Sequence, residues 1–160
     1  MALETSIFTT DAWSRSTMRA ELANAHAYYL VAVRSDDSDA ARPASVDGYA
    51  GLLAPSGAAE ADVQTIAVAP NARRHGVGRA LVAALIGEAA ERGAHEVFLE
   101  VRADNPGAQT LYRSFGFEDI GVRPRYYQPD GVDALVMKLM VGRSAAAPVI
   151  GATDALKEHP

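Results

Sequence analysis

The chain has 160 residues, no cysteine and a formal net charge of −5. This length suits one domain with a sizeable core, the lack of cysteine excludes disulfides and a cysteine nucleophile, and the negative charge argues against general electrostatic binding of nucleic acid. No apolar run is long enough to span a membrane and no secretory leader pattern opens the sequence, so we expect a cytoplasmic protein.

The first third of the chain predicts two helices followed by two strands. Met1 to Phe8 has apolar residues at helical spacing, and a second helix is expected from Trp13 towards Asn24. The apolar runs Tyr28 to Val33 and Gly48 to Leu53 predict neighbouring strands. Between them, the polar segment Arg34 to Val46 is expected to form a long solvated hairpin loop, to which we assign no role.

A strand, a glycine loop and a helix are predicted between Val63 and Leu85. The β-branched run ends at Ala69-Pro70, where proline removes the next ladder donor. The apolar positions change parity within the run, which a β-bulge would explain. Gly76 and Gly78 then open a helix whose apolar residues recur every fourth position.

The start of this helix has the chemistry of an anion site. The free N–H groups of a first helical turn bind phosphates, and glycine lets a phosphate approach the backbone closely. Arg73, Arg74 and Arg79 add charged donors. The alternative is an ordinary amphipathic helix with surface arginines. A dinucleotide fingerprint is disfavoured, because Leu81 stands where its third glycine is required.

The next strand carries a candidate catalytic carboxylate. The glycine-loop helix should end near Arg92, because Gly93 suits the left-handed position after a helix. Val97 to Val101 predicts a strand covered on both faces, with Glu100 beside apolar Phe98 and Val101. Glu100 is therefore a candidate general base, and the alternative is a strand-end glutamate that reaches water.

A short helix and two further strands complete the predicted domain. Asp104-Asn105-Pro106 predicts a helix start, and this helix should carry Tyr112 and end before Gly116. The strands are expected around 117–122 and 134–140, joined through Arg123 to Gly131. Residues 1–141 then form one domain, and residues 142–160, which lack periodicity, form a flexible tail.

Several segments resemble the GNAT family of N-acetyltransferases. The pattern R-x-x-G-x-G-x-A at Arg73, Gly76, Gly78 and Ala80 resembles the family's coenzyme A pyrophosphate loop. The resemblance covers about Leu3 to Leu139. Within the family, the sequence is most similar to the branch that acetylates the N-terminal alanine of a bacterial ribosomal protein. Its further segments are LEVRADN at 99–105, AQTLYRSFGF at 108–117 and RYYQPDGVDALVM at 125–137.

This resemblance implies an α/β GNAT fold, in which helices flank a mixed central sheet whose fourth and fifth strands splay apart. The family's first strand has no counterpart in this sequence, and the alternatives are a true start that lies upstream and a chain that does without this strand. It implies acetyl-CoA as cofactor, Glu100 as base and Tyr112 as acid. The implied cofactor contacts are Ile66, Ala67, Val68, Arg73, Arg74, His75, Gly76, Val77, Gly78, Arg79, Ala80, Asn105 and Tyr112. The implied substrate contacts are Trp13, Arg125, Tyr126 and Tyr127.

The implied reaction is direct transfer of acetyl to the α-amine of a protein N-terminus. A ribosomal protein is the implied partner, without nucleic acid, membrane or metal, and we expect a monomer or weak dimer. The alternatives are a GNAT enzyme that acetylates lysine or a small amine, and a non-catalytic acyl-CoA sensor. Each tyrosine also has an ordinary alternative, Tyr112 as a core residue and Tyr126 and Tyr127 as strand aromatics.

Overall fold

The computed structural model describes residues 14–34 and 45–142. The predicted helix at Met1 to Phe8, Trp13, most of the predicted hairpin loop and residues 143–160 lie outside these ranges, so those expectations stay predictions. The elements are α2 (Arg15–Leu22), β1 (Ala27–Arg34), β2 (Ser45–Leu53), β3 (Glu60–Val68), the 3-10 helix η1 (Pro70–Ala72), α3 (Val77–Glu91), β4 (Glu96–Arg102), α4 (Pro106–Ser114), β5 (Glu118–Tyr127) and β6 (Val132–Met140).

The strands form one mixed sheet in the order β1-β2-β3-β4-β6-β5. Every neighbouring pair is antiparallel except β3 and β4, which are parallel because α3 connects them. The predicted α/β fold is confirmed. Within the described residues β1 is the first strand and forms one edge of the sheet, so the missing strand of the family has no counterpart there.

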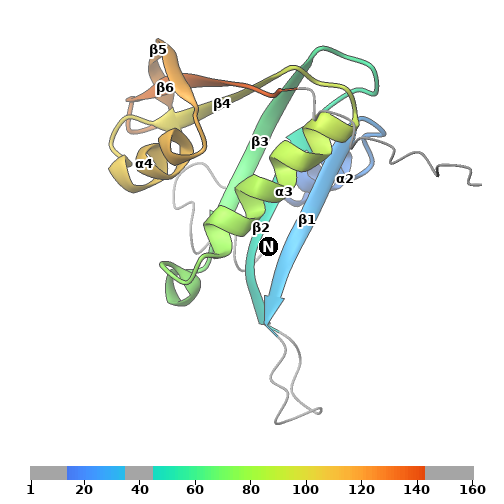
Figure 1. The fold of residues 1–160 in the computed structure, drawn as a ribbon. Coiled ribbons are helices and arrows are strands. Elements are labelled where there is room, and N and C mark those ends of the chain that lie inside the picture. Colours follow the sequence, from blue (N-terminus) through green and yellow to red (C-terminus); the bar gives the residue numbers. More distant parts are fainter. Residues whose placement is uncertain (1–13, 35–44, 143–160) are drawn as a thin grey trace, which may run out of the picture.

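The parallel pairing of β3 with β4 is short. It joins Glu60, Ala61 and Asp62 to Glu96, Val97 and Phe98 and then stops, although β3 continues to Val68 and β4 to Arg102. Figure 1 shows β4, β6 and β5 turning away from β3 beyond this point. The predicted splay of the two central strands is therefore present.

A bulge in β3 lies next to this splay. Thr65 is opposite Gly51 and Val63 is opposite Leu52, which leaves Gln64 as the extra residue. The bulge reverses the facing of the residues that follow it. The change of parity in the sequence therefore predicted the bulge correctly.

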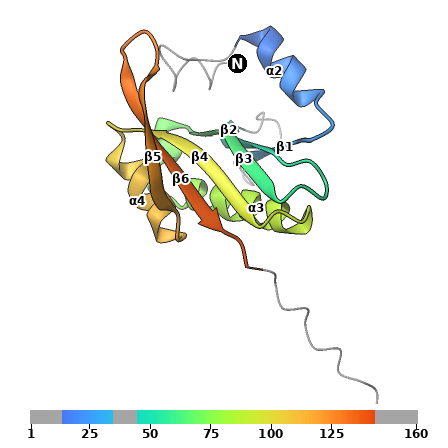
Figure 2. The same cartoon turned by 90° about the horizontal axis from the view of Figure 1, so that it is seen from above.

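Helices lie on both faces of the sheet. Figure 2 shows α3 and α4 on one face and α2 on the other. The main core lies between the sheet and α3, where Leu52, Leu81, Leu85, Val97 and Met137 are almost fully buried. The end of α3 matches its prediction, because Arg92 caps the helix and Gly93 follows with a φ of 95°.

Burial along β4 corrects one expectation. Val97, Leu99 and Val101 are buried, whereas Phe98 and Glu100 on the opposite face are only partly covered. The strand was expected to be covered on both faces, but α3 and α4 pack on one face only. An uninterrupted apolar run in the sequence does not distinguish these two cases.

Two predicted loops are shorter than expected because the strands extend into them. Arg34 pairs with Ser45 at the end of the β1–β2 ladder. Similarly, β5 runs to Tyr127 after an irregularity at Arg125, which has a φ of 51°. None of the helices in the described ranges has both the length and the apolar content needed to cross a bilayer.

Truncation of a core leucine should test the packing of α3 on the sheet. Leu85→Ala, at a residue that is 1% exposed, should lower the free energy of unfolding by about 2–5 kcal/mol through lost burial and a residual cavity. Urea denaturation measures this change. The matched control is Leu22→Ala on α2, at a residue that is 58% exposed, and it should change the free energy by less than about 1 kcal/mol.

Candidate functional site

The N-terminus of α3 is built to receive an anion. Gly76 occupies the N-cap position with a φ of 84°, and no side chain caps the helix. The amides of Val77 and Gly78 therefore belong to an uncapped first turn, where N–H groups and the positive end of the helix dipole favour negative charge. Arg74, with a φ of 63°, gives the loop a second left-handed residue.

Two of the three predicted arginines are anchored beside this helix end. Arg73 donates from Nε to the carbonyl oxygen of Val68 at 3.3 Å, which folds the loop back on the end of β3. Arg79 donates from Nη2 to Ser114 Oγ at 3.0 Å, and its guanidinium lies 5.1 Å from the ring centroid of Phe115. Arg73, Arg74 and Arg79 are all exposed. Each anchored guanidinium uses one of its five N–H groups in these bonds and keeps others for an anion.

The last residues of β3 border the splay. Ile66 pairs with Ala50, Ala67 with Tyr49 and Val68 with Gly48, all on the β2 side. Their pairing with β4 has already ended at Asp62. The β4-facing backbone of this segment is thus turned towards the opening between the strands, as predicted for cofactor-binding residues.

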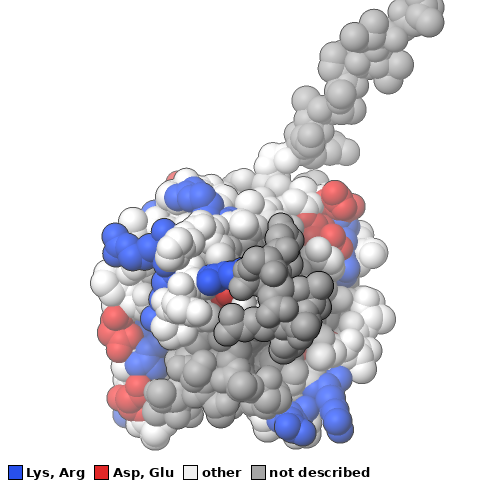
Figure 3. Space-filling model, turned by 90° about the horizontal axis from the view of Figure 1, so that it is seen from below, with Lys and Arg blue, Asp and Glu red and all other residues white. Residues whose placement is uncertain are grey.

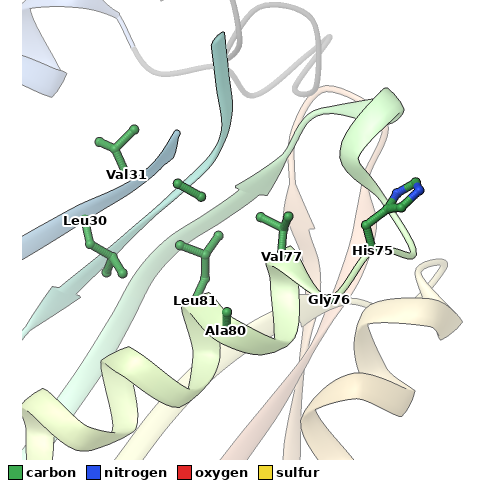
Figure 4. A pocket seen from close by; sticks show the side chains of 8 residues that line it. Leu30, Val31, His75, Gly76, Val77, Ala80 and Leu81 are labelled. Atoms are coloured by element: carbon green, nitrogen blue, oxygen red, sulfur yellow. The ribbon is translucent and has the colours of Figure 1, made fainter. Parts of the chain in front are cut away.

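A cavity of about 320 Å³ lies elsewhere on α3, between its first turns and β1. Figure 4 shows Val77 and Leu81 pointing towards it from the helix, and Leu30 and Val31 coming from the strand. His75 and Gly76 contribute to its rim. Because β1 is two strands away from β3 in the order of the sheet, this apolar cavity is separate from the splay.

Glu100 lies just beyond the last β3–β4 pair, on the face of β4 opposite the main core. Its side chain is 27% exposed and forms an ion pair with Arg123, with 3.2 Å between Glu100 Oε1 and Arg123 Nη2. The surroundings of Glu100 are therefore more polar than the apolar environment that the sequence predicted. Sequence spacing missed this partner, because the contact crosses β6 and depends on the register of three strands.

Tyr112 lies on the other face of the sheet. It belongs to α4, is 9% exposed and makes an edge-to-face contact with Phe117 at 5.9 Å between ring centroids. Burial raises the pKa of its phenol to about 12, so the hydroxyl holds its proton at neutral pH. Both alternatives for Tyr112 are thus compatible with the fold, since a core residue can also supply a proton.

The two candidate catalytic residues lie on opposite faces of the sheet. Tyr112 packs in the core with Val97, Leu99 and Val101, and Glu100 alternates with these residues along β4. The ladder between β3 and β4 has ended at this level of the sheet, so no backbone pairing joins the two strands between these side chains.

Asn105 has a structural role at the start of α4. Its side-chain oxygen accepts a hydrogen bond from the Ala108 amide at 3.1 Å, as the predicted helix cap requires. Gln109, which the sequence did not single out, is buried and donates to the carbonyl oxygens of Arg102 and Ala103 at 3.0 and 3.1 Å. These bonds hold α4 against the end of β4.

The predicted substrate aromatics lie at the end of the β5–β6 hairpin. The rings of Tyr126 and Tyr127 are nearly perpendicular, with 5.1 Å between centroids, and Tyr126 is 47% exposed. The Arg125 amide donates to Asp133 Oδ1 at 2.8 Å, which fixes the irregularity between them. In Figure 2 the hairpin turn projects on the side of the sheet that carries α2.

Arg102, also missed in the sequence, joins this hairpin to the β4–α4 connection. Its guanidinium donates to both carboxylate oxygens of Asp104, at 3.0 and 3.1 Å, and to Asp130 Oδ2 at 2.7 Å. It also lies 5.2 Å from the ring centroid of Tyr127. Its hydrogen bonds lower the pKa of both carboxyl groups, so these contacts persist in mildly acidic solution.

Charges on the described surface are mixed. On the face in Figure 3, basic and acidic side chains are interspersed, and the described residues form no continuous positive field there. Within the described ranges, no group of three or more His, Asp or Glu side chains is arranged to hold a metal ion.

Comparison with known sequences identifies a family. A sequence model of the acetyltransferase (GNAT) family matches residues 2–117. The chain is 40% identical over 139 residues to the N-alpha-acetyltransferase RimI of Mycobacterium tuberculosis, covering 85% of this chain and 81% of the relative. It is also 45% identical over 84 residues to the ribosomal protein bS18-alanine N-acetyltransferase of Escherichia coli, covering 51% and 57%.

A third relative is much longer than this chain. The uncharacterized protein ML0378 of Mycobacterium leprae is 42% identical over 139 residues, which cover 85% of this chain and 36% of the relative. Among solved structures, the ribosomal-protein-S18-alanine N-acetyltransferase from Escherichia coli has a TM-score of 0.71 at 30% identity, covering 98% of this chain and 90% of that chain. A Salmonella typhimurium acetyltransferase, yncA, solved with its cofactor acetyl-CoA, has a TM-score of 0.54 at 25% identity, covering 66% and 64%.

The raised pKa of Tyr112 predicts a loss of stability at high pH. The phenol ionises near pH 10 in the unfolded chain and near 12 in the folded one, so its contribution is complete below pH 10 and is lost as the pH rises from 10 to 12. Tyr112→Phe should remove this part of the slope, at most about 1.4 kcal/mol per pH unit. Urea denaturation between pH 9.5 and 11.5 measures it. The control Tyr126→Phe, at an exposed ring, should keep the wild-type slope, and an equal slope in all three proteins would contradict burial of the phenol.

Proposed function

Because the chain belongs to the acetyltransferase (GNAT) family, we propose that it transfers acetyl from acetyl-CoA to the α-amine of a protein N-terminus. The proposed natural substrate is the N-terminal alanine of a small-subunit ribosomal protein. Relatives whose names specify N-alpha or ribosomal-protein-alanine acetylation support this choice. The observation that carries the proposal is the position of Glu100, immediately beyond the point where β3 and β4 separate.

The proposed cofactor position follows from the uncapped end of α3. The pyrophosphate would receive hydrogen bonds from the backbone around Gly76 and Gly78, with Arg74 and Arg79 adding charge. The pantetheine would lie in the splay against Ile66 to Val68, close to the start of α4 at Asn105. This arrangement would bring the thioester to the opening between the two faces.

The proposed chemistry needs no covalent enzyme intermediate. The α-ammonium first loses one proton to solvent, and the neutral amine nitrogen then bonds to the acetyl carbon as the carbon–sulfur bond breaks. The second amine proton passes to Glu100, and the leaving thiolate takes the proton of Tyr112. Exchange with solvent restores both residues. The pKa of Tyr112, about 12, keeps its phenol protonated at neutral pH, so a proton is present on the hydroxyl when the thiolate leaves.

The proposed substrate side is the face that carries α2. Tyr126 and Tyr127 on the β5–β6 hairpin would line a slot for the first residues of the peptide, with Arg125 and Trp13 as further contacts; Trp13 lies outside the described residues. An α-amine suits a single glutamate base. The pKa of an α-ammonium group is about 7.7–8.0, against about 10.4 for lysine. At pH 7 roughly 10% of an α-amine is therefore neutral, compared with less than 0.1% of a lysine side chain.

Removal of the proposed base should abolish turnover with little effect on the fold. Glu100→Gln should lower kcat by about 10²- to 10⁴-fold while the affinity for acetyl-CoA stays near that of the wild type. The matched control is Glu96→Gln. Glu96 lies on the same face of β4 and pairs with Lys138 at 3.0 Å, but it precedes the splay. Wild-type turnover in Glu100→Gln over the whole pH range would exclude the glutamate as the base.

The choice of amine can be tested on one peptide that has a free N-terminal alanine and an internal lysine. Incubation with acetyl-CoA should place the acetyl group on the α-amine, and fragmentation by mass spectrometry locates it. Acetyl on the lysine alone would refute N-terminal specificity and favour the lysine-directed alternative. Binding of acetyl-CoA with no transfer to any amine would favour the acyl-CoA sensor.

A further inference from the structure

Arg123 contacts both sides of the proposed amine site. Its guanidinium lies 3.2 Å from Glu100 Oε1 and 5.6 Å from the ring centroid of Tyr126. It therefore joins the proposed base to a proposed substrate-lining aromatic. A permanent cation beside the base meets no catalytic need, because the base must be free to accept a proton from the substrate amine.

The strand register explains why Arg123 reaches Glu100. On β6, Ala134 is opposite Arg123 of β5 and Val136 is opposite Glu100 of β4, so both side chains belong to the same face. Asp62 of β3 pairs with Phe98 and lies on this face too. Partial desolvation and the charge of Glu60 raise the pKa of Asp62, whereas the charge of Arg123 lowers it. The charge of Arg123 thus acts on two carboxylates.

We propose that the Arg123 guanidinium is a displaceable counter-ion that occupies the place of the substrate's α-ammonium on Glu100. In the free protein Arg123 neutralises the carboxylate. An arriving peptide N-terminus, which carries the same charge, replaces the guanidinium as the ionic partner of Glu100. Arg123 is a positioning residue in this scheme, and the inference rests on the proposed function of the site.

Because the ion pair is exposed, its replacement by the substrate amine costs little free energy. The Arg123 side chain is 57% exposed, and surface ion pairs contribute only about 0–1 kcal/mol because solvent screens both charges. The displaced guanidinium can remain in contact with the face of Tyr126. A neutral N-terminus, such as the acetylated product, cannot replace the arginine, so Arg123 would return to Glu100 and favour product release.

Peptide binding without acetyl transfer tests this inference directly. Two peptides of identical sequence, one with a free N-terminal alanine and one N-acetylated, are titrated into the 160-residue protein with CoA at pH 7, where most of the α-amine is protonated. Arg123→Gln should tighten binding of the free-amine peptide by about two- to fivefold, the gain expected from removing one exposed competing ion pair. The affinity for the acetylated peptide should stay unchanged.

Three control variants separate competition from a structural role. Arg123→Lys keeps the competing charge and should bind both peptides as the wild type does. Arg113→Gln removes an exposed ion pair that lies away from the site, in which Arg113 Nη2 is 2.7 Å from Asp119 Oδ2. This variant should also bind both peptides as the wild type does. Glu100→Gln combined with Arg123→Gln should cancel the gain in affinity for the free amine.

The inference would be overturned if Arg123→Gln weakened or left unchanged the binding of the free-amine peptide, or if it altered both peptides equally. Equal losses would assign Arg123 to support of Tyr126. These results are distinct from failure of the proposed function, which would appear as absence of α-amine acetylation by the wild-type protein.

Discussion

The parallel ladder between β3 and β4 ends after three residue pairs, and the candidate site depends on this early end. A parallel ladder that continued to Val68 would have closed the centre of the sheet and separated its two faces completely. Its early end leaves backbone at Ile66 to Val68 facing an opening, with Glu100 across it. The bulge at Gln64 lies beside the point of separation and adds local twist.

The two faces at this opening have different physical characters. On the α3–α4 face, Tyr112 is buried among apolar side chains and remains protonated. On the other face, Glu100 is accessible to water and is paired with Arg123. The sheet thus separates the protonated phenol of Tyr112 from the carboxylate of Glu100 and gives each group different surroundings.

The sequence predicted the elements well where local chemistry decides them. Pro70 marked the end of a strand, Gly93 the end of α3 and Asn105 the start of α4, and each signal acts through the backbone of its own segment. The parity change in β3 correctly indicated a bulge. The described residues cover the two faces of β4 unequally, which the apolar run did not indicate, because such a run does not reveal how much packs on each face.

Contacts between distant segments explain what the sequence did not predict at the site. Arg123 and Glu100 meet only because β6 lies between their strands, and Arg102 meets Asp130 only because the hairpin turns back towards β4. Both contacts depend on strand order and register, which single-residue patterns do not encode. The candidate residues themselves were found through family resemblance, and their roles remain predictions.

Arg102 adds a mechanical link between the two halves of the candidate site. Asp104 directly precedes Asn105 at the start of α4, and Asp130 belongs to the turn after Tyr127. By binding both carboxylates, the guanidinium ties the aromatic hairpin to the segment that begins α4. These contacts add to the β4–β6 and β5–β6 ladders, which already join the hairpin to β4, and they extend that connection to the start of α4.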